Sequence, residues 1–141
     1  MRVFLLLLTL TGLLAGPAFA QSISFGDDSG DWAQDGECDD PRFEGPGMTL
    51  TPLLSEDIMR DATDCRTAFE RGRLTLRGVD ADGRIDFGDD TGDWANDGEC
   101  DDMRFEGPGM TLTPLLFDDI MHDASDCRNA YKAGRLRLAG Q

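Results

Sequence analysis

Two short stretches of alternating apolar and polar residues mark the ends of a segment that covers residues 22–78. Residues 23–25 and residues 74–76 each have the period of a strand, and the two stretches could pair with each other. Residues 26–40 are rich in acids and glycines, which predicts a loop. The pattern therefore predicts a small antiparallel sheet that brings the ends of the segment together.

Two short helices are predicted inside the same segment. Residues 50–59 carry apolar side chains at helical spacing, although Pro52 interrupts the pattern near its start. Residues 64–71 have the second helical pattern, with Thr63 or Asp64 as the N-cap and a glycine directly after it as the stop. The segment thus mixes short strands with short helices.

The same pattern occurs a second time in the chain. Residues 84–140 align with residues 22–78 without a gap at an offset of 62, and 42 of the 57 aligned positions are identical. The identical blocks are FGDD, GDW, DGECDD, RFEGPGMTLTPLL, DIM and DC. The linker between the copies, residues 79–83, reads VDADG and predicts a turn between two strand-like runs. We therefore expect two repeat units, 22–78 and 84–140, that pack closely.

Residues 1–20 have the pattern of a signal peptide. Arg2 precedes an apolar run, and Ala18-Phe19-Ala20 is the small-x-small sequence that a signal peptidase cleaves. The run is shorter than the roughly 20 residues that cross a bilayer, so an uncleaved anchor is the less favoured alternative. We expect a mature chain that begins at Gln21, is exported to the periplasm or the extracellular space, and has no membrane attachment after cleavage.

Each unit contains two cysteines, Cys38 and Cys65 in the first and Cys100 and Cys127 in the second. In an exported chain, disulfides are expected, and four cysteines allow three pairings. Duplication favours the self-contained pairs Cys38–Cys65 and Cys100–Cys127, each worth ~3.6 kcal/mol from loop closure. The alternative, a zinc site of four thiolates, lacks CxxC spacing. The predicted fold is α+β, with two small disulfide-stapled, loop-rich repeat units, each with short antiparallel strands and one or two short helices.

The net charge of the chain limits the classes of partner that it is expected to bind. It has 28 acidic residues against 13 basic ones, a formal net charge of -15, and a single histidine. This balance argues against nucleic acid and against an anionic membrane surface, because both attract clustered Lys and Arg. Cations and an unidentified protein with a basic surface are the expected partners.

The acids are concentrated in one loop of each unit. The seven in the first copy, all kept in the second, are Asp27, Asp28, Asp31, Asp35, Glu37, Asp39 and Asp40. Carboxylates at this density favour a hard divalent cation, calcium above all, although a solvated face is the alternative. The loop is not an EF-hand, because Ala33 and Arg42 occupy loop positions 3 and 12 when Asp31 is position 1. A Cys38–Cys65 bond would also bring Asp39 and Asp64 together.

The motifs DGECD and DATDC resemble the calcium-binding segments of the Notch-type repeats of animal receptors, in which acids around two such cysteines bind one calcium. The resemblance is one of site chemistry and covers about ten residues per unit. It implies these calcium ligands: Asp35, Asp39, Asp61 and Asp64 in the first unit, and Asp97, Asp101, Asp123 and Asp126 in the second. The longer pattern WAxDGECDDxRFxGPGM…DAxDC is also similar to a short module of exported bacterial proteins, which implies localisation more than mechanism.

The remaining aromatic and basic residues favour structural roles. Trp32 and Trp94 are expected to anchor the small cores, together with residues such as Phe25 and Phe43, and stacking on a sugar is the alternative. Arg42 and its repeat Arg104 are expected to pair with neighbouring carboxylates. His122 stands where the first unit has Arg60, and we expect it on the surface.

A non-catalytic role is predicted. The units share no histidine, the cysteines are expected to be bonded, and Ser55 is replaced by Phe117 in the second copy. A glycosidase-type carboxylate pair would need a cleft that units of this size hardly offer. The sequence therefore favours an exported calcium-binding tandem module with a structural or protein-interaction role. The alternative is an acidic accessory or inhibitor protein that binds a basic partner without metal.

Overall fold

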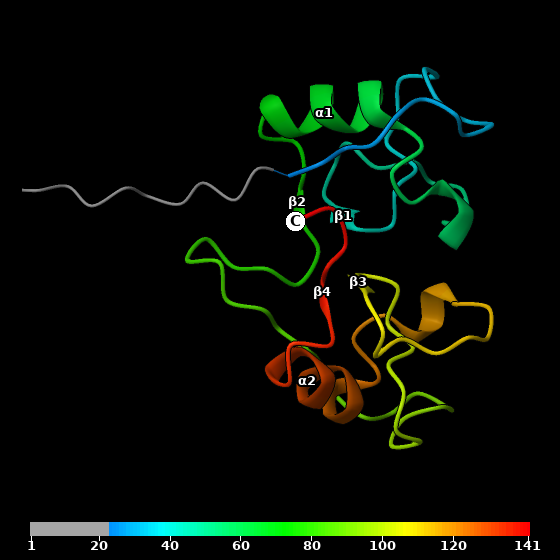
Figure 1. Cartoon of the computed structure of the whole chain (residues 1–141). Helices are drawn as coiled ribbons and strands as arrows, with labels where there is room; N and C mark the ends of the chain where they lie inside the picture. Colours follow the sequence, from blue (N-terminus) through cyan, green and yellow to red (C-terminus); the bar gives the residue numbers. More distant parts are fainter. Residues whose placement is uncertain (1–22) are drawn as a thin grey trace, which may run out of the picture.

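The computed structural model describes residues 23–141, so the predicted signal peptide and the cleavage site before Gln21 lie outside the described residues. Figure 1 shows two similar units, each with one α-helix and one two-stranded sheet, which confirms the α+β prediction. No helix in this part of the chain has the length and apolarity to cross a membrane. The first unit contains β1 (Phe43–Glu44), a 3-10 turn (Ser55–Asp57), α1 (Ala62–Glu70) and β2 (Thr75–Leu76), and the second contains β3 (Phe105–Glu106), a 3-10 turn (Phe117–Asp119), α2 (Ala124–Lys132) and β4 (Arg137–Leu138).

Helix α1 begins two residues earlier than the sequence pattern predicted. Asp61 is the N-cap, but its side chain makes no capping hydrogen bond. Asp28 from the acidic loop supplies the cap instead, because its carboxylate accepts hydrogen bonds from the N–H of Thr63 at 2.7 Å and from the Thr63 hydroxyl at 2.6 Å. A distant residue thus determines where the helix begins, which a local cap rule does not detect.

The helix predicted over residues 50–59 is wrong, because only one 3-10 turn forms there. Leu50 is 96% exposed, so the apolar spacing does not mark a buried face. The main chain is held by the hydroxyl of Thr49, which accepts the N–H of Thr51 at 3.3 Å and lies 3.1 Å from the Thr51 hydroxyl. Met59 has a φ of 58°, which ends the segment in a left-handed conformation.

The sheets are built differently from the predicted pairing of residues 23–25 with residues 74–76. β2 pairs with β1, with Phe43 opposite Leu76, and β4 pairs with β3 in the same register. Residues 23–25 extend the other unit instead, because the N–H of Ser24 donates to the carbonyl of Gly140 at 2.8 Å. Figure 1 shows the C-terminal segment, drawn in red, which runs from the second unit to β1 and β2 of the first.

The linker explains this exchange of pairing. Its turn is closed by the N–H of Gly83, which donates to the carbonyl of Asp80 at 2.9 Å, and an antiparallel bridge joins Val79 to Ile85. The start of the second unit therefore pairs with the end of the first. Because the units repeat each other, the start of the first unit takes the same place on the end of the second.

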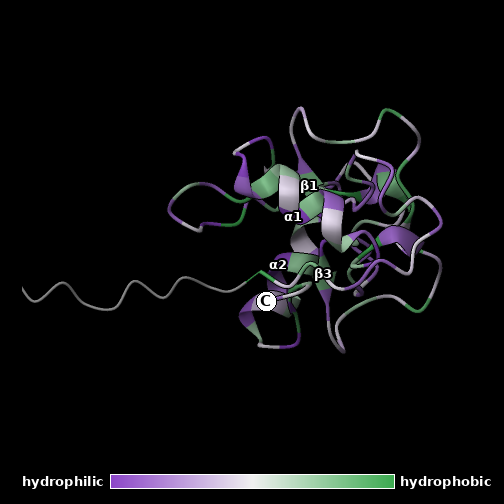
Figure 2. Ribbon diagram, turned by 90° about the horizontal axis from the view of Figure 1, so that it is seen from above, coloured by the Kyte–Doolittle hydropathy of each residue, from purple (hydrophilic) through white to green (hydrophobic). Residues whose placement is uncertain are grey.

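Each unit has a small aromatic core. Phe25 and Phe43 stack with ring centroids 5.4 Å apart, and Phe69 packs edge-on against both. Figure 2 shows that hydrophobic segments are short and alternate with hydrophilic ones. Trp32 and Trp94 do not belong to the cores, since they are 54% and 53% exposed, so their predicted role as core anchors is wrong.

Two buried arginines join the units across their boundary. Arg42 pairs with Asp40, as predicted, and its Nη1 donates to Ser24 O at 3.0 Å and to Ala139 O at 2.9 Å. Arg104 pairs with Asp102 in the same way, and its Nη1 donates to carbonyl oxygens of both units. Each arginine thus bonds its own unit and the end of the other.

Close packing at this boundary requires glycine. Gly78 has a φ of 64°, and a Cβ atom there would lie 2.0 Å from Nη1 of Arg104. Gly140 has a φ of 81°, and a Cβ atom there would lie 2.2 Å from Nη1 of Arg42. Any other residue at these two positions would displace the arginines that hold the units together.

Candidate metal centre

A disulfide joins the acidic loop to α1 in each unit. Cys38 is bonded to Cys65 and Cys100 to Cys127, with Cα atoms 4.6 Å apart in both bridges. This is the self-contained pairing that duplication favours. All four sulfurs are used, so the alternative zinc site of four thiolates does not exist in this fold.

The bridge places two buried carboxylates next to each other. Asp39 is 3% exposed and Asp61 is 2% exposed. One oxygen of Asp61, Oδ2, accepts the N–H of Asp39 at 2.8 Å. The same oxygen lies 3.5 Å from the Sγ atom of Cys65, which is a contact and not a hydrogen bond, because a disulfide sulfur carries no hydrogen.

The other side of this carboxylate pair has no donor. Oδ2 of Asp39 and Oδ1 of Asp61 are buried and accept no hydrogen bond from the described residues, and Asp101 and Asp123 repeat the arrangement. A buried carboxylate oxygen without a partner is destabilising by roughly 1–3 kcal/mol or more. The same unpartnered oxygens occur in both units, so each of these places could hold a cation.

The pKa values of the pair reflect the same imbalance. Burial, together with the smaller effect of the neighbouring carboxylates of Asp35 and Asp57, raises the pKa of Asp39 to about 6. Burial likewise raises the pKa of Asp61 to about 6, with the charges of Asp64 and Asp39 acting in the same direction. In the second unit the pKa of Asp101 rises to about 6 and that of Asp123 to about 7, for the same reasons.

The two other predicted ligands lie at the rim of the site. Asp64 accepts the N–H of Gly36 at 2.8 Å, and Asp35 accepts the N–H of Glu37 at 3.1 Å, so both organise the acidic loop. Asp126 and Asp97 do the same in the second unit. Asp39 and Asp61 form the buried centre, whereas the sequence favoured Asp39 with Asp64.

The four predicted carboxylate ligands of a unit do not form a complete coordination shell for a metal ion. Among the described residues, the groups of three or more potential ligand atoms within 4.8 Å of one another are Cys38, Asp61 and Cys65, with their repeats. Two of the three atoms are bonded sulfurs, which leaves one carboxylate as a usable ligand in each group. A cation at this place would therefore take oxygens from both buried aspartates and the rest of its ligands from water, the main chain or a shifted rim.

The other acids of the loop have separate tasks. Asp28 caps α1, Asp40 binds Arg42, and Asp27 accepts the N–H of Ser29 at 3.0 Å. The charge run is therefore not a uniform solvated face. Asp57 was not among the predicted ligands, yet it is 8% exposed, and its pKa is raised by burial and then by Glu56 and Asp31.

Trp32 lies in a pocket of about 130 Å³ beside this centre. Three acids, Asp31, Glu56 and Asp57, line the same pocket together with one base, Arg60. An exposed indole next to three carboxylates can contact a cationic side chain by cation–π attraction and by ion pairing.

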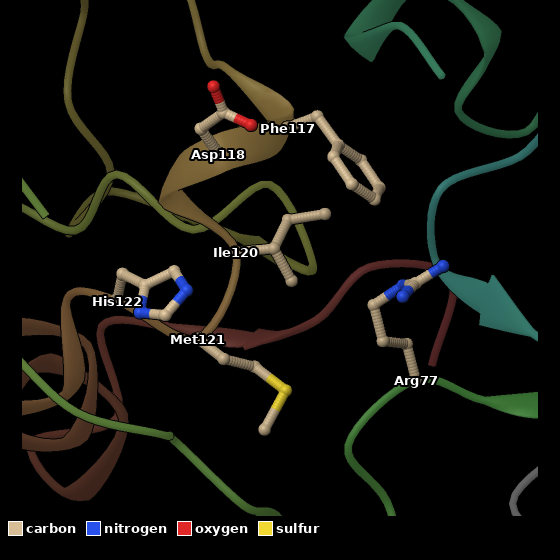
Figure 3. A pocket seen from close by; sticks show the side chains of 6 residues that line it. All are labelled: Arg77, Phe117, Asp118, Ile120, Met121 and His122. Carbon is tan, nitrogen blue, oxygen red and sulfur yellow. The ribbon is translucent and has the colours of Figure 1, made fainter. Parts of the chain in front are cut away.

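A larger pocket of about 390 Å³ lies at the boundary between the units, and Figure 3 shows the side chains that line it. His122 is one of them and is partly exposed, in agreement with the predicted surface position. Its Nδ1 atom lies 2.8 Å from Oδ1 of Asp89, and this hydrogen bond, with that from Thr91, lowers the pKa of Asp89 to about 2.

Comparisons with known proteins add no assignment: no family model, no curated protein and no solved structure matches this chain. The resemblance to the exported bacterial module therefore rests on the sequence motifs, to which the structure adds two disulfide-bonded, Cys-Asp-Cys-containing units of similar build. Disulfides indicate an oxidising compartment.

Proposed function

We propose that this protein is an exported, non-catalytic tandem module in which each unit binds one calcium ion and which serves a structural or protein-interaction role. The observation that carries the proposal is the pair of buried oxygens, Oδ2 of Asp39 and Oδ1 of Asp61, that have no partner, together with their repeats in Asp101 and Asp123. Two adjacent buried carboxylates at neutral pH are best neutralised by a cation.

The donor set favours calcium among the common cations. It consists of oxygens only, since the nearby sulfurs are bonded to each other. Calcium accepts six to eight oxygens in irregular geometry, including water, whereas magnesium demands a near-ideal octahedron. The carboxylates of Asp35 and Asp64, at the rim, would lie in or next to the coordination shell and add negative charge.

The expected effect of calcium is moderate. With an extracellular-type dissociation constant of roughly 0.1–1 mM, ~2 mM calcium adds about 0.7–1.8 kcal/mol per site to the free energy of unfolding. Thermal melting of the disulfide-bonded protein in calcium and in chelator tests the proposal. We expect a rise of several degrees in calcium and a smaller one in magnesium.

A matched variant makes this test specific. The exposed linker acid Asp82 is bonded to Arg84 and lies outside both centres, so Asp82→Asn should keep the full calcium response. Asp39→Asn combined with Asp101→Asn should abolish it. Identical melting of the natural protein in calcium and in chelator would mean that the site does not exist.

A second candidate is an acidic accessory or inhibitor protein that binds a basic partner without metal. The observation that favours it is the pocket in which the exposed Trp32 lies beside Asp31, Glu56 and Asp57. Binding of a Lys/Arg-rich peptide would then weaken steeply with salt and would be lost in Trp32→Ala combined with Trp94→Ala. Binding that persists in both conditions would argue against it.

A further inference from the structure

The pocket of about 390 Å³ at the boundary between the units has a composition unlike the rest of the surface. It is lined by Arg77 from the first unit and, from the second, by Phe117, Asp118, Ile120, Met121 and His122. Its volume is within the usual range for a small-ligand site, and boundaries between packed units commonly hold such sites. Figure 3 shows Arg77 facing Phe117, with Ile120 between Arg77 and His122.

The pocket lies where the two units differ more than they do on average. Of its six lining positions, four differ between the repeats, although only 15 of the 57 aligned positions (57 minus 42) differ in all. The four substitutions place Arg77, Phe117, Asp118 and His122 where the other copy has Ala139, Ser55, Glu56 and Arg60. The apolar floor of Ile120 and Met121 is common to both copies. Divergence has therefore produced one pocket with an arginine and an aromatic ring in its wall.

Arg77 supplies a half-buried cation with donors to spare. Its Nε donates to Pro41 O at 3.0 Å and its Nη2 to Phe43 O at 2.7 Å. Its Nη1 lies 3.8 Å from the nearest oxygen of Glu44, too far for a hydrogen bond, and no other acceptor among the described residues reaches it. Burial lowers the pKa of Arg77, so the guanidinium is under-compensated in its surroundings.

His122 is oriented toward the pocket from the opposite side. Its Nδ1 is held by Asp89 at 2.8 Å, and Figure 3 shows the other ring nitrogen directed toward Ile120. A cation and an imidazole thus face an apolar floor, and Asp118 is the one carboxylate in the lining. This is an electrostatic exception in a chain with 28 acids and 13 bases. A cationic ligand would be repelled by Arg77, and a polar neutral ligand would leave the floor uncovered.

We propose that this pocket binds a monocarboxylate with an apolar body, independently of the calcium sites. The carboxylate accepts hydrogen bonds from Nη1 of Arg77, whose guanidinium lies over the Phe117 ring at 5.3 Å, and the apolar body covers Ile120, Met121 and the exposed part of Phe117. The ring of His122 bounds the other end. A free organic acid and the C-terminus of a peptide that ends in an apolar residue share this chemistry.

His122 is the only histidine of the chain, so its ring resonances report on this pocket alone. The full mature protein is titrated with 3-phenylpropionate, with an N-acetylated peptide that ends in Phe with a free carboxylate, and with the same peptide as a C-terminal amide. We expect the His122 signals to shift with at least one carboxylate and not with the amide. Shifts with the peptide but not the free acid identify a chain terminus as the source.

Variants that restore the other copy's residues supply the controls. Arg77→Ala should weaken carboxylate binding about 10- to 100-fold, since a hydrogen bond to a charged group is lost. Phe117→Ser should weaken it less, and Arg84→Ala, an exposed arginine at the first position of the second unit, should leave it unchanged. All titrations are run in calcium and in chelator, so that failure here is distinguishable from failure of the calcium sites. A dissociation constant above about 10 mM for every carboxylate, or equal binding of acid and amide, overturns the proposal.

Discussion

Asp39 and Asp40 are consecutive residues with the same burial and opposite surroundings. Asp40 is 1% exposed, binds Arg42 through both carboxylate oxygens, and also accepts the N–H of Met59 at 2.9 Å. Asp39 is 3% exposed, its N–H donates to Oδ2 of Asp61, and one oxygen of its carboxylate has no partner. The second unit repeats the contrast at Asp101 and Asp102.

The contrast separates two uses of a buried carboxylate. The Asp40 carboxylate is neutralised inside the protein, so it fixes Arg42 and through it the boundary between the units. The Asp39 carboxylate is left charged beside a second carboxylate, so the folded state gains stability from anything that neutralises the pair. The two carboxylates are equally buried, so the difference between them comes from the group that each one contacts.

Removal of the arginine should have the largest effect. Arg42→Ala leaves Asp40 buried without its cation, and loss of one partner of a buried ion pair costs about 3–5 kcal/mol. Urea denaturation with the disulfides intact measures this loss. Asp40→Asn combined with Arg42→Met should lose clearly less, because no charge then stays unpaired. A decrease of less than ~1 kcal/mol in the free energy of unfolding of Arg42→Ala would show that the Arg42–Asp40 ion pair does not hold the units together.

The stability of the calcium-free protein should rise as the pH falls from 8 to 5. The pKa of Asp39, Asp61 and Asp101 is raised from 3.8 to about 6, so the folded state binds protons more tightly than the unfolded state. Stability from this source is fully present below pH ~4 and is lost as the pH rises through about 6, with a size of roughly 2–3 kcal/mol per unit.

Denaturation at several pH values in chelator and in calcium checks this trend. Calcium should flatten it, because the cation replaces the protons at high pH. Below pH ~4 the trend should reverse, since Asp28 and Asp89, whose pKa values are lowered by hydrogen bonds, must then take up protons. A chelated protein that is more stable at pH 8 than at pH 5 contradicts the unpartnered pair.

Neutralisation of one aspartate per pair should stabilise the calcium-free protein. Asp39→Asn with Asp101→Asn removes the repulsion inside each pair, and we expect a gain of about 1–2 kcal/mol in chelator at pH 8, together with loss of the calcium response. The sign is opposite to that for Arg42→Ala, although the positions lie within three residues. Equilibrium unfolding in chelator measures it, and a clear loss of stability would overturn the contrast between Asp39 and Asp40.

The rim acids should matter least. Asp64→Asn with Asp126→Asn keeps an amide oxygen that can still accept the N–H of Gly36 and of Gly98. We expect a change below ~0.5 kcal/mol in chelator and a calcium response that is reduced but present. A complete loss of that response would move the centre of the site from Asp61 to Asp64, as the sequence first favoured.

The repeat, the cysteine pairs and the pairing of Arg42 could be predicted because each depends on residues close in sequence or on the duplication itself. The separate tasks of Asp28, Asp39 and Asp40 could not, because they depend on which distant group each carboxylate meets after folding. The exposure of Trp32 was missed for a related reason. Three aromatic rings, two stacked and one edge-on, already form the small core of the unit.

The reciprocal joints also set an order of events during synthesis. Arg42 finds one of its acceptors, the carbonyl of Ala139, 97 residues further along the chain, and Ser24 pairs with Gly140. The first half of a nascent chain therefore has a buried arginine to place before the acceptor exists. Contacts this distant form late and slow the overall rate of folding. The joint between the first and the last described residues can therefore close only after the last residues have been synthesised.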